Sequence, residues 1–98
     1  MLENKFQAKL KKELERRFKG CIVMKMDANA IQGIPDLIVL FNNKWASLEC
    51  KKTAKASRRP NQNYYVELMN NMSFSRFVYP ENIKEVLNEL EEFFKDVK

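Results

Sequence analysis

Apolar residues follow two different periods along this chain, and each change of period marks a new element. At the start they recur every fourth residue, from Leu2 to Phe18, which predicts an amphipathic helix that Lys19 and Gly20 then end. The middle of the chain holds short strand-like runs, and helical spacing returns after Pro60 and again after Pro80. The predicted helices cover 2–18, 60–72 and 81–98, and the predicted strands cover 21–26, 36–41, 44–51 and 73–79. This αβββαβα order predicts a mixed α/β sheet with helices against its faces, in a single domain over 1–98.

The segment 36–41 is apolar on both alternating faces after its first residue, which is typical of a central strand covered on both sides. Asn42 and Asn43 form a candidate two-residue turn, because Asn tolerates positive φ. Such a turn pairs residues whose numbers sum to 85, so Asp36 is expected directly opposite Glu49.

Two carboxylates facing each other in a sheet repel, so a purely structural sheet should avoid this arrangement. A divalent cation reverses the sign of the interaction, since paired carboxylates are hard oxygen ligands for Mg²⁺ or Mn²⁺. Strand alternation places Lys51 on the same face as Glu49 and turns the thiol of Cys50 to the other face. The sequence therefore predicts a metal site with a lysine beside it.

The first helix offers a third carboxylate. With Leu10 as the centre of the apolar stripe and about 100° per residue, Glu3 falls at about +20°, in the middle of that stripe. A glutamate on a buried face is costly unless something pairs with it. Glu3 therefore either joins the metal site or simply favours the positive end of the helix dipole.

Charge is distributed unevenly among the 98 residues, which hold 18 Lys and Arg against 13 Asp and Glu, a net charge of +5. Seven basic residues lie in 1–19 and six in 44–59, whereas 81–98 holds six acidic residues against three basic ones. A basic body with an acidic last helix favours a polyanionic partner such as DNA, although a solvated basic surface is the alternative.

The amino-acid composition excludes several classes of protein and of chemistry. The chain has no histidine, so catalysis would have to use carboxylates, lysine and a metal. No apolar run approaches the roughly 20 residues of a membrane span and the start does not resemble a signal peptide, so no membrane partner is expected. Two cysteines are too few for a disulfide framework, which favours a reducing compartment, the cytoplasm of a bacterial or phage-infected cell.

These residues carry a family resemblance. Gly33-Ile34-Pro35-Asp36, a run of apolar residues and then Glu49-Cys50-Lys51 resemble the signature of the PD-(D/E)xK nucleases. With the early Glu3 and with Gln62 inside Arg-Arg-Pro-Asn-Gln, the chain looks like the VRR-NUC family of that superfamily, from Glu3 to about residue 90. The resemblance implies a restriction-endonuclease-like αβββαβα core.

The resemblance also implies a role for each matched residue. Asp36 and Glu49 would be ligands of Mg²⁺ or Mn²⁺, and the backbone carbonyl of Cys50 would be a further ligand. Glu3 would bind the metal through a water molecule. Lys51 would orient the attacking water and help to deprotonate it, and Gln62 would support the site. Cys50 stands where the family has an aliphatic residue, which is tolerable because only its backbone is needed. Lys52 follows Lys51, so a second amine is available, although strand parity favours Lys51.

Together these features predict a metal-dependent endonuclease that hydrolyses DNA and is selective for branched DNA such as a Holliday junction. Symmetric cuts across a junction need two sites, which implies a homodimer. The alternatives are a non-catalytic nucleic-acid-binding module, or a nuclease subunit that docks through 81–98 into a larger phage or repair assembly. The basic loop after the third predicted strand is expected either to bind the DNA backbone or to be an ordinary solvated loop. Its basic residues are Lys52, Lys55, Arg58 and Arg59.

Four large side chains of the second predicted helix are expected in the core rather than on a platform for stacked bases: Tyr64, Tyr65, Met69 and Met72.

Overall fold

The computed structural model describes residues 2–95, and its elements follow the predicted order. The helices are α1 (Glu3–Arg17), α2 (Pro60–Met72) and α3 (Ile83–Lys95), and the strands are β1 (Ile22–Lys25), β2 (Leu37–Phe41), β3 (Lys44–Cys50) and β4 (Ser75–Val78). The predicted α/β fold class is therefore confirmed. Residues 96–98 of the predicted last helix lie outside the described residues.

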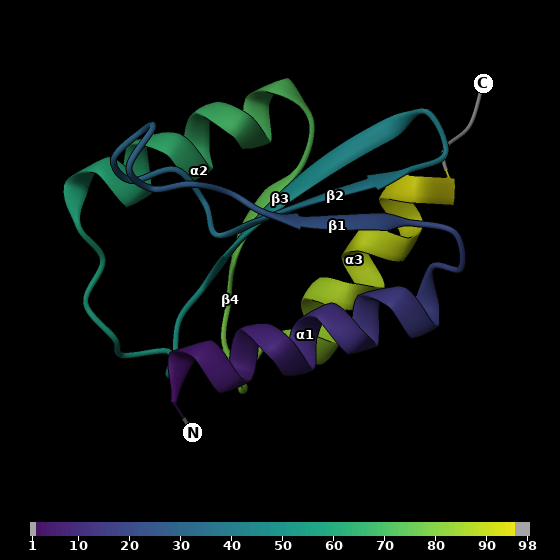
Figure 1. The fold of residues 1–98 in the computed structure, drawn as a ribbon, viewed down its shortest axis with the longest axis horizontal. Helices are drawn as coiled ribbons and strands as arrows, with labels where there is room; N and C mark the ends of the chain where they lie inside the picture. Colours follow the sequence, from purple (N-terminus) through teal and green to yellow (C-terminus); the bar gives the residue numbers. More distant parts are fainter. Residues whose placement is uncertain (1, 96–98) are drawn as a thin grey trace.

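The four strands form one sheet in the order β1-β2-β3-β4, with antiparallel pairs except between β3 and β4, which are parallel. Helices α1 and α3 cover one face of this sheet and α2 lies on the other (Figure 1). The β2–β3 ladder pairs Leu37 with Leu48 and Phe41 with Lys44, and Asn42 in the turn has a φ of 56°. The predicted two-residue turn and its register are thus confirmed.

The hydrophobic core lies between the sheet and the pair α1 and α3. Phe6, Leu10 and Leu14 of α1 are fully buried there, as the four-residue period of the sequence predicts. α3 begins at Ile83 rather than directly after Pro80, because the side chain of Asn82 is hydrogen-bonded to the end of β4. Its carboxamide oxygen accepts from the Tyr79 N–H at 2.9 Å and its Nδ2 donates to the Phe77 carbonyl at 3.0 Å.

Two predictions about burial are wrong in detail, for a common reason. β3, not β2, is the strand covered on both faces: Ile38 and Leu40 on the second face of β2 are only half-buried. Tyr64 and Met72 of α2 are 59% and 65% exposed rather than in the core. Both differences arise because α2 packs on β3 and β4 and leaves the outer face of β1 and β2 uncovered.

No helix within residues 2–95 has the length and apolar character that crossing a membrane requires.

Candidate metal centre

Three carboxylates from separate segments of the chain meet at one end of the sheet. Glu3 is the first residue of α1, Asp36 directly precedes β2, and Glu49 lies near the end of β3. One carboxylate oxygen of each residue lies within 4.8 Å of those of the other two. The structure therefore brings the three predicted acidic residues together, and Glu3 faces the other two carboxylates rather than only its own helix end.

The backbone around Asp36 is held from both sides. Its carboxylate accepts a hydrogen bond from the Cys50 N–H at 2.9 Å, and its carbonyl accepts from the Met26 N–H at 2.7 Å. Burial raises the pKa of Asp36 above its ordinary value, against the opposing effects of the Cys50 hydrogen bond and of the Lys51 and Lys25 charges. The peptide N–H of Cys50 thus fixes the Asp36 carboxylate, while the Cys50 thiol is buried in the core on the opposite face, as predicted.

Glu49 is the most deeply buried acid of the site, with 2% of its surface exposed. Burial, and then the neighbouring charge of Asp36, raise its pKa to about 8 despite the attraction of Lys51. One of its oxygens, Oε2, accepts a hydrogen bond from Gln62, but Oε1 has no hydrogen-bond partner among the described residues. A buried acceptor without a partner costs about 1–3 kcal/mol, which is the condition that a bound cation would relieve.

Gln62 of α2 contacts both titratable groups at the end of β3, the carboxyl of Glu49 and the amine of Lys51, which directly follows the strand. Its Oε1 accepts from the Lys51 Nζ at 2.7 Å and from the Arg59 N–H at 3.0 Å, so its Nε2 is directed at Glu49 Oε2, 2.9 Å away. Lys51 is only 7% exposed, and its Nζ lies 3.8 Å from the same Glu49 oxygen. The amide therefore fixes the positions of an amine and a carboxylate in a buried setting.

A pocket of about 380 Å³ opens beside these groups, and both Asp36 and Glu49 line it. Its opposite wall is the loop between β1 and β2, which touches the first turn of α2 at one close contact. A Cβ placed on Gly33 would lie 2.4 Å from the Asn61 Cβ and 2.9 Å from the Asn61 carbonyl carbon. The loop and the helix that carries Gln62 are thus in direct contact at a position that only glycine can fill.

The four predicted DNA-binding residues all lie exposed after β3, but they do not form a single group. Arg59 precedes α2 and lines the pocket. The guanidinium of Arg58 instead lies 3.9 Å from the centre of the Phe77 ring. Lys52 and Lys55 make no ion pair with any residue from 2 to 95.

Two further residues near Asp36 were not among the predicted site residues. The Gln7 side chain and the Lys25 charge both lower the pKa of the Asp36 carboxyl, against the larger effect of burial. Gln7 could have been found from the helical period, since it lies four residues after Glu3 on α1. Lys25 is found only once β1 is paired with β2, which places it opposite Leu37.

No family model and no curated protein matches this sequence. Solved structures do match, and two of them are described as a VRR_NUC domain protein and a VRR_NUC domain. The chain has the VRR-NUC fold. The first structure superposes with a TM-score of 0.71 at 19% identity, over 97% of this chain and 89% of that one. The second has a TM-score of 0.63 at 23% identity, over 83% of this chain and 92% of the other. The VRR-NUC fold expected from the motifs is thereby confirmed.

Proposed function

We propose that this chain is a metal-dependent endonuclease that hydrolyses DNA phosphodiester bonds. The observation that carries the proposal is the buried carboxylate group of Glu3, Asp36 and Glu49, with the unpartnered Oε1 of Glu49 and the amine of Lys51 beside it. A structural sheet gains nothing from such a grouping, because each carboxylate raises the cost of charging the next. The VRR-NUC fold supports the same assignment by analogy.

The donor set suits a hard divalent cation such as Mg²⁺ or Mn²⁺. Asp36 and Glu49 would hold the ion directly, the Cys50 carbonyl would complete the set, and Glu3 would act through a water molecule. When bound, the ion supplies a more acidic water molecule and positive charge for the phosphoryl oxygens. Its affinity would rise with pH, because Glu49 must lose its proton to become a ligand.

In the proposed hydrolysis, Lys51 would act on the attacking water and on the phosphoryl group. A water oxygen attacks phosphorus, the bond from phosphorus to the leaving oxygen breaks, and the leaving oxygen takes up a proton. Lys51, held by Gln62, would orient the attacking water, help to deprotonate it and offset the charge that develops on the phosphoryl group. Without histidine in the chain, proton transfer depends on this amine, the carboxylates and water.

A cleavage assay tests the assignment, with Mg²⁺ or Mn²⁺ and with duplex, single-stranded and four-way-junction DNA. Asp36→Asn and Glu49→Gln should each abolish cleavage while DNA binding in EDTA stays intact or strengthens, because a negative charge beside phosphate is removed. Glu67→Gln, on the exposed side of α2, is the matched control and should cleave like wild type. Undiminished cleavage by both site variants would contradict the proposed centre, and a wild-type chain that binds but never cleaves would favour a non-catalytic binding module.

We further propose that branched DNA is the preferred substrate and that the active form is a homodimer. On the uncovered outer face of the sheet, Ile22 is 55% exposed opposite Leu40, and Met24 is 48% exposed opposite Ile38. None of these four side chains is charged, so a second copy of the same face can pack against it without like-charge repulsion. Exposed apolar residues that adjoin one another in this way are typical of a surface that is buried in an assembly.

Sedimentation velocity tests the dimer. Wild type should sediment as a dimer, Met24→Glu as a monomer, and the control Ile31→Glu, which changes an exposed apolar residue in the β1–β2 loop, as a dimer. A wild-type monomer at micromolar concentration would refute the homodimer.

A role as a subunit of a larger phage or repair assembly remains the second candidate, with α3 as its docking surface. Both cysteines are free thiols, which agrees with the cytoplasmic location that we also propose.

A further inference from the structure

The outward side of α1 carries a row of basic side chains whose charge the proposed site does not use. At about 100° per residue, four basic residues fall within an arc of roughly 60° on this side. We call this row the α1 stripe, and its members are Lys5, Lys9, Lys12 and Arg16, all of them exposed. They are spaced by three or four residues, so they follow the helix axis rather than winding around it.

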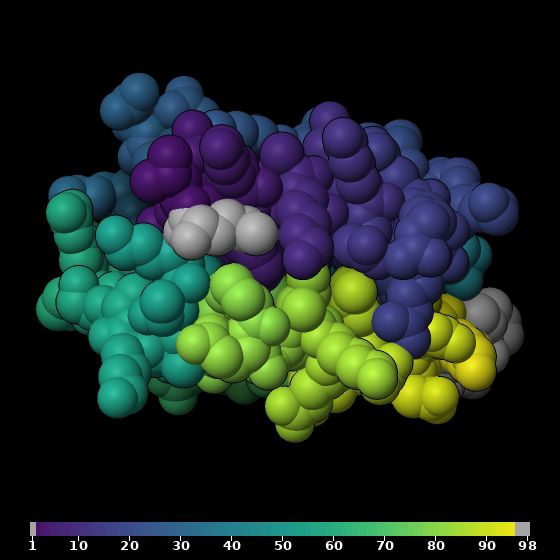
Figure 2. All heavy atoms as spheres, turned by 90° about the horizontal axis from the view of Figure 1, so that it is seen from below, coloured from purple at the N-terminus to yellow at the C-terminus, as the bar shows by residue number. Residues whose placement is uncertain are grey.

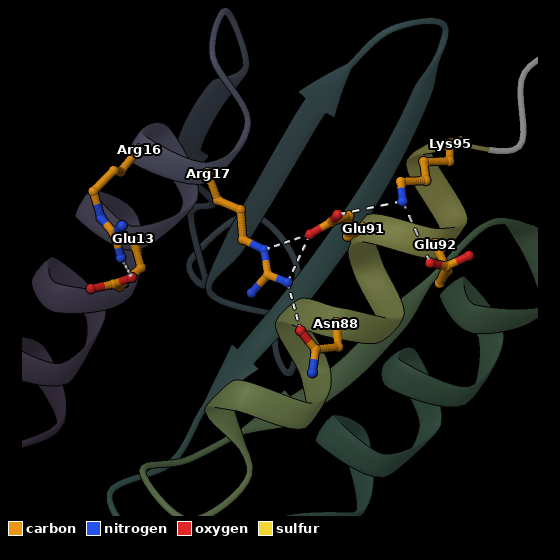
Figure 3. Close-up of polar contacts among 7 residues, drawn as sticks. All are labelled: Glu13, Arg16, Arg17, Asn88, Glu91, Glu92 and Lys95. Atoms are coloured by element: carbon orange, nitrogen blue, oxygen red, sulfur yellow. Dashed lines mark hydrogen bonds and ion pairs between the residues drawn. The ribbon is translucent and has the colours of Figure 1, made fainter.

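One member of the α1 stripe is already paired with an acid of the same helix: Arg16 binds Glu13, so the unpaired charge of the stripe is carried by its three lysines. Arg17 turns away from the stripe to bind Glu91 and Asn88 of α3 (Figure 3). Of the remaining acids of α1, Glu3 lies in the metal centre, and Glu15 is exposed about 60° around the helix from Lys12, outside the arc of the stripe. Lys5, Lys9 and Lys12 make no ion pair with any residue between 2 and 95.

Neighbouring segments extend this positive surface in two directions. Lys9 lines a groove between α1 and α3 together with Lys84. At its other end, the start of α1 lies beside the loop that follows β3, as Figures 1 and 2 both show. That loop carries Lys52 and Lys55, so the basic surface runs from the mouth of the proposed site along the length of α1.

We propose that the α1 stripe binds the phosphate backbone of a DNA arm that extends away from the cleavage site. The proposal rests on the nuclease function and adds to it the path of the substrate. From Lys5 to Arg16 is 11 residues, or about 17 Å along the helix axis. One strand of duplex DNA rises about 3.4 Å per nucleotide, so the stripe spans roughly five nucleotides. Contacts of this kind carry no sequence information and hold the substrate in register with the site.

The test compares two double variants that each remove two positive charges from residues 9–19. Lys9→Gln/Lys12→Gln removes two members of the stripe, whereas Lys11→Gln/Lys19→Gln removes two exposed lysines outside it. Affinity for a 20-bp duplex is measured in EDTA over a range of salt concentrations. The stripe variant should lower the slope of log affinity against log salt by about 2, since each phosphate contact contributes roughly 0.9. The control variant should lower it by less than about 0.5, and both variants should melt like wild type.

Binding in EDTA separates this inference from the proposed function. A differential loss of affinity without any cleavage by wild type would overturn the nuclease assignment and leave the stripe standing. Normal cleavage with equal slopes for the two variants would overturn the stripe alone. If neither variant changes the slope, or wild type does not bind duplex at low salt, the stripe does not bind DNA and an anionic protein partner takes its place as the explanation.

Discussion

Gly33 allows the sharpest test of how the pocket wall positions the proposed chemistry. Gly33 and Gly20 both have a φ of +93°, so alanine is strained at either position by roughly 1–2 kcal/mol. A Cβ at Gly20 meets no atom within 4 Å, whereas at Gly33 it would lie 2.4 Å from the Asn61 Cβ. The backbone strain is therefore matched between Gly33→Ala and Gly20→Ala, and only the contact with α2 differs.

The size of the expected effect follows from the distances. Ordinary van der Waals contact begins at 3.4 Å, so the first turn of α2 must retreat by about 1 Å in Gly33→Ala. The same shift would lengthen the bonds of Gln62 to Glu49 and Lys51 from 2.9 and 2.7 Å to roughly 3.9 and 3.7 Å, beyond hydrogen-bonding range. A displacement of about 1 Å in a side chain that positions catalytic groups, as Gln62 positions Lys51 and Glu49, costs about 100-fold in rate.

Single-turnover cleavage at saturating DNA and metal measures this effect, with thermal melting alongside. Gly33→Ala should be about 100-fold slower than wild type, and Gly20→Ala should stay within about threefold, although the backbone strain lowers the melting temperature of both by several degrees. Asn61→Gly removes the nearest atom, so Gly33→Ala/Asn61→Gly should recover part of the rate. Equal rates for the two alanine variants would refute the idea that the loop positions Gln62 through this contact.

Three further predictions concern the charges of the site. Millimolar Mg²⁺ or Mn²⁺ should raise the melting temperature, and Asp36→Asn should raise the metal-free value and reduce the metal effect; identical wild-type curves in EDTA and Mn²⁺ would contradict metal binding. In EDTA, the free energy of unfolding should fall as pH rises from about 5 to 8, because the pKa of Glu49 is about 8 when folded against an ordinary 4.5, and Glu49→Gln should flatten this dependence. Lys51→Ala should lose cleavage at every salt concentration, whereas exposed Lys52→Ala should only weaken binding and lower the salt slope by about one; the reverse result would contradict the strand parity.

The central part of the site could be predicted because it depends on short-range rules. Once Asn42 and Asn43 form a two-residue turn, the pairing of β2 with β3 follows. In the observed pairs Leu37–Leu48 and Phe41–Lys44 the two residue numbers add up to 85, as predicted. Strand alternation then separates Lys51 from Cys50 without any knowledge of the rest of the fold. These steps need only turn length and a period of two residues, both of which are visible in the sequence.

The surroundings of the site depend on packing between distant segments, which no local period encodes. The contact of Gly33 with Asn61 joins residues 28 positions apart, and it exists only because α2 crosses back over β3 and β4. The same placement leaves Tyr64 and Met72 exposed, although their helical spacing gave them the appearance of core residues. A helical pattern gives the apolar side of a helix but not the width of the surface that it covers.

The conflict between stability and charge in β3 is the strongest physical argument for a functional site. Its last residues are buried throughout, yet they include Glu49, and the adjoining Lys51 is buried as well. Gln62 donates a hydrogen bond to one oxygen of Glu49 and accepts one from the Lys51 amine, but the other oxygen of Glu49 has no partner among residues 2–95. An apolar pair of similar size would stabilise this strand better. The fold is consistent with its sequence elsewhere but not at these three converging carboxylates, which is what the proposed metal site would explain: their oxygens and the neighbouring amine have the chemistry that suits a cation beside a phosphate.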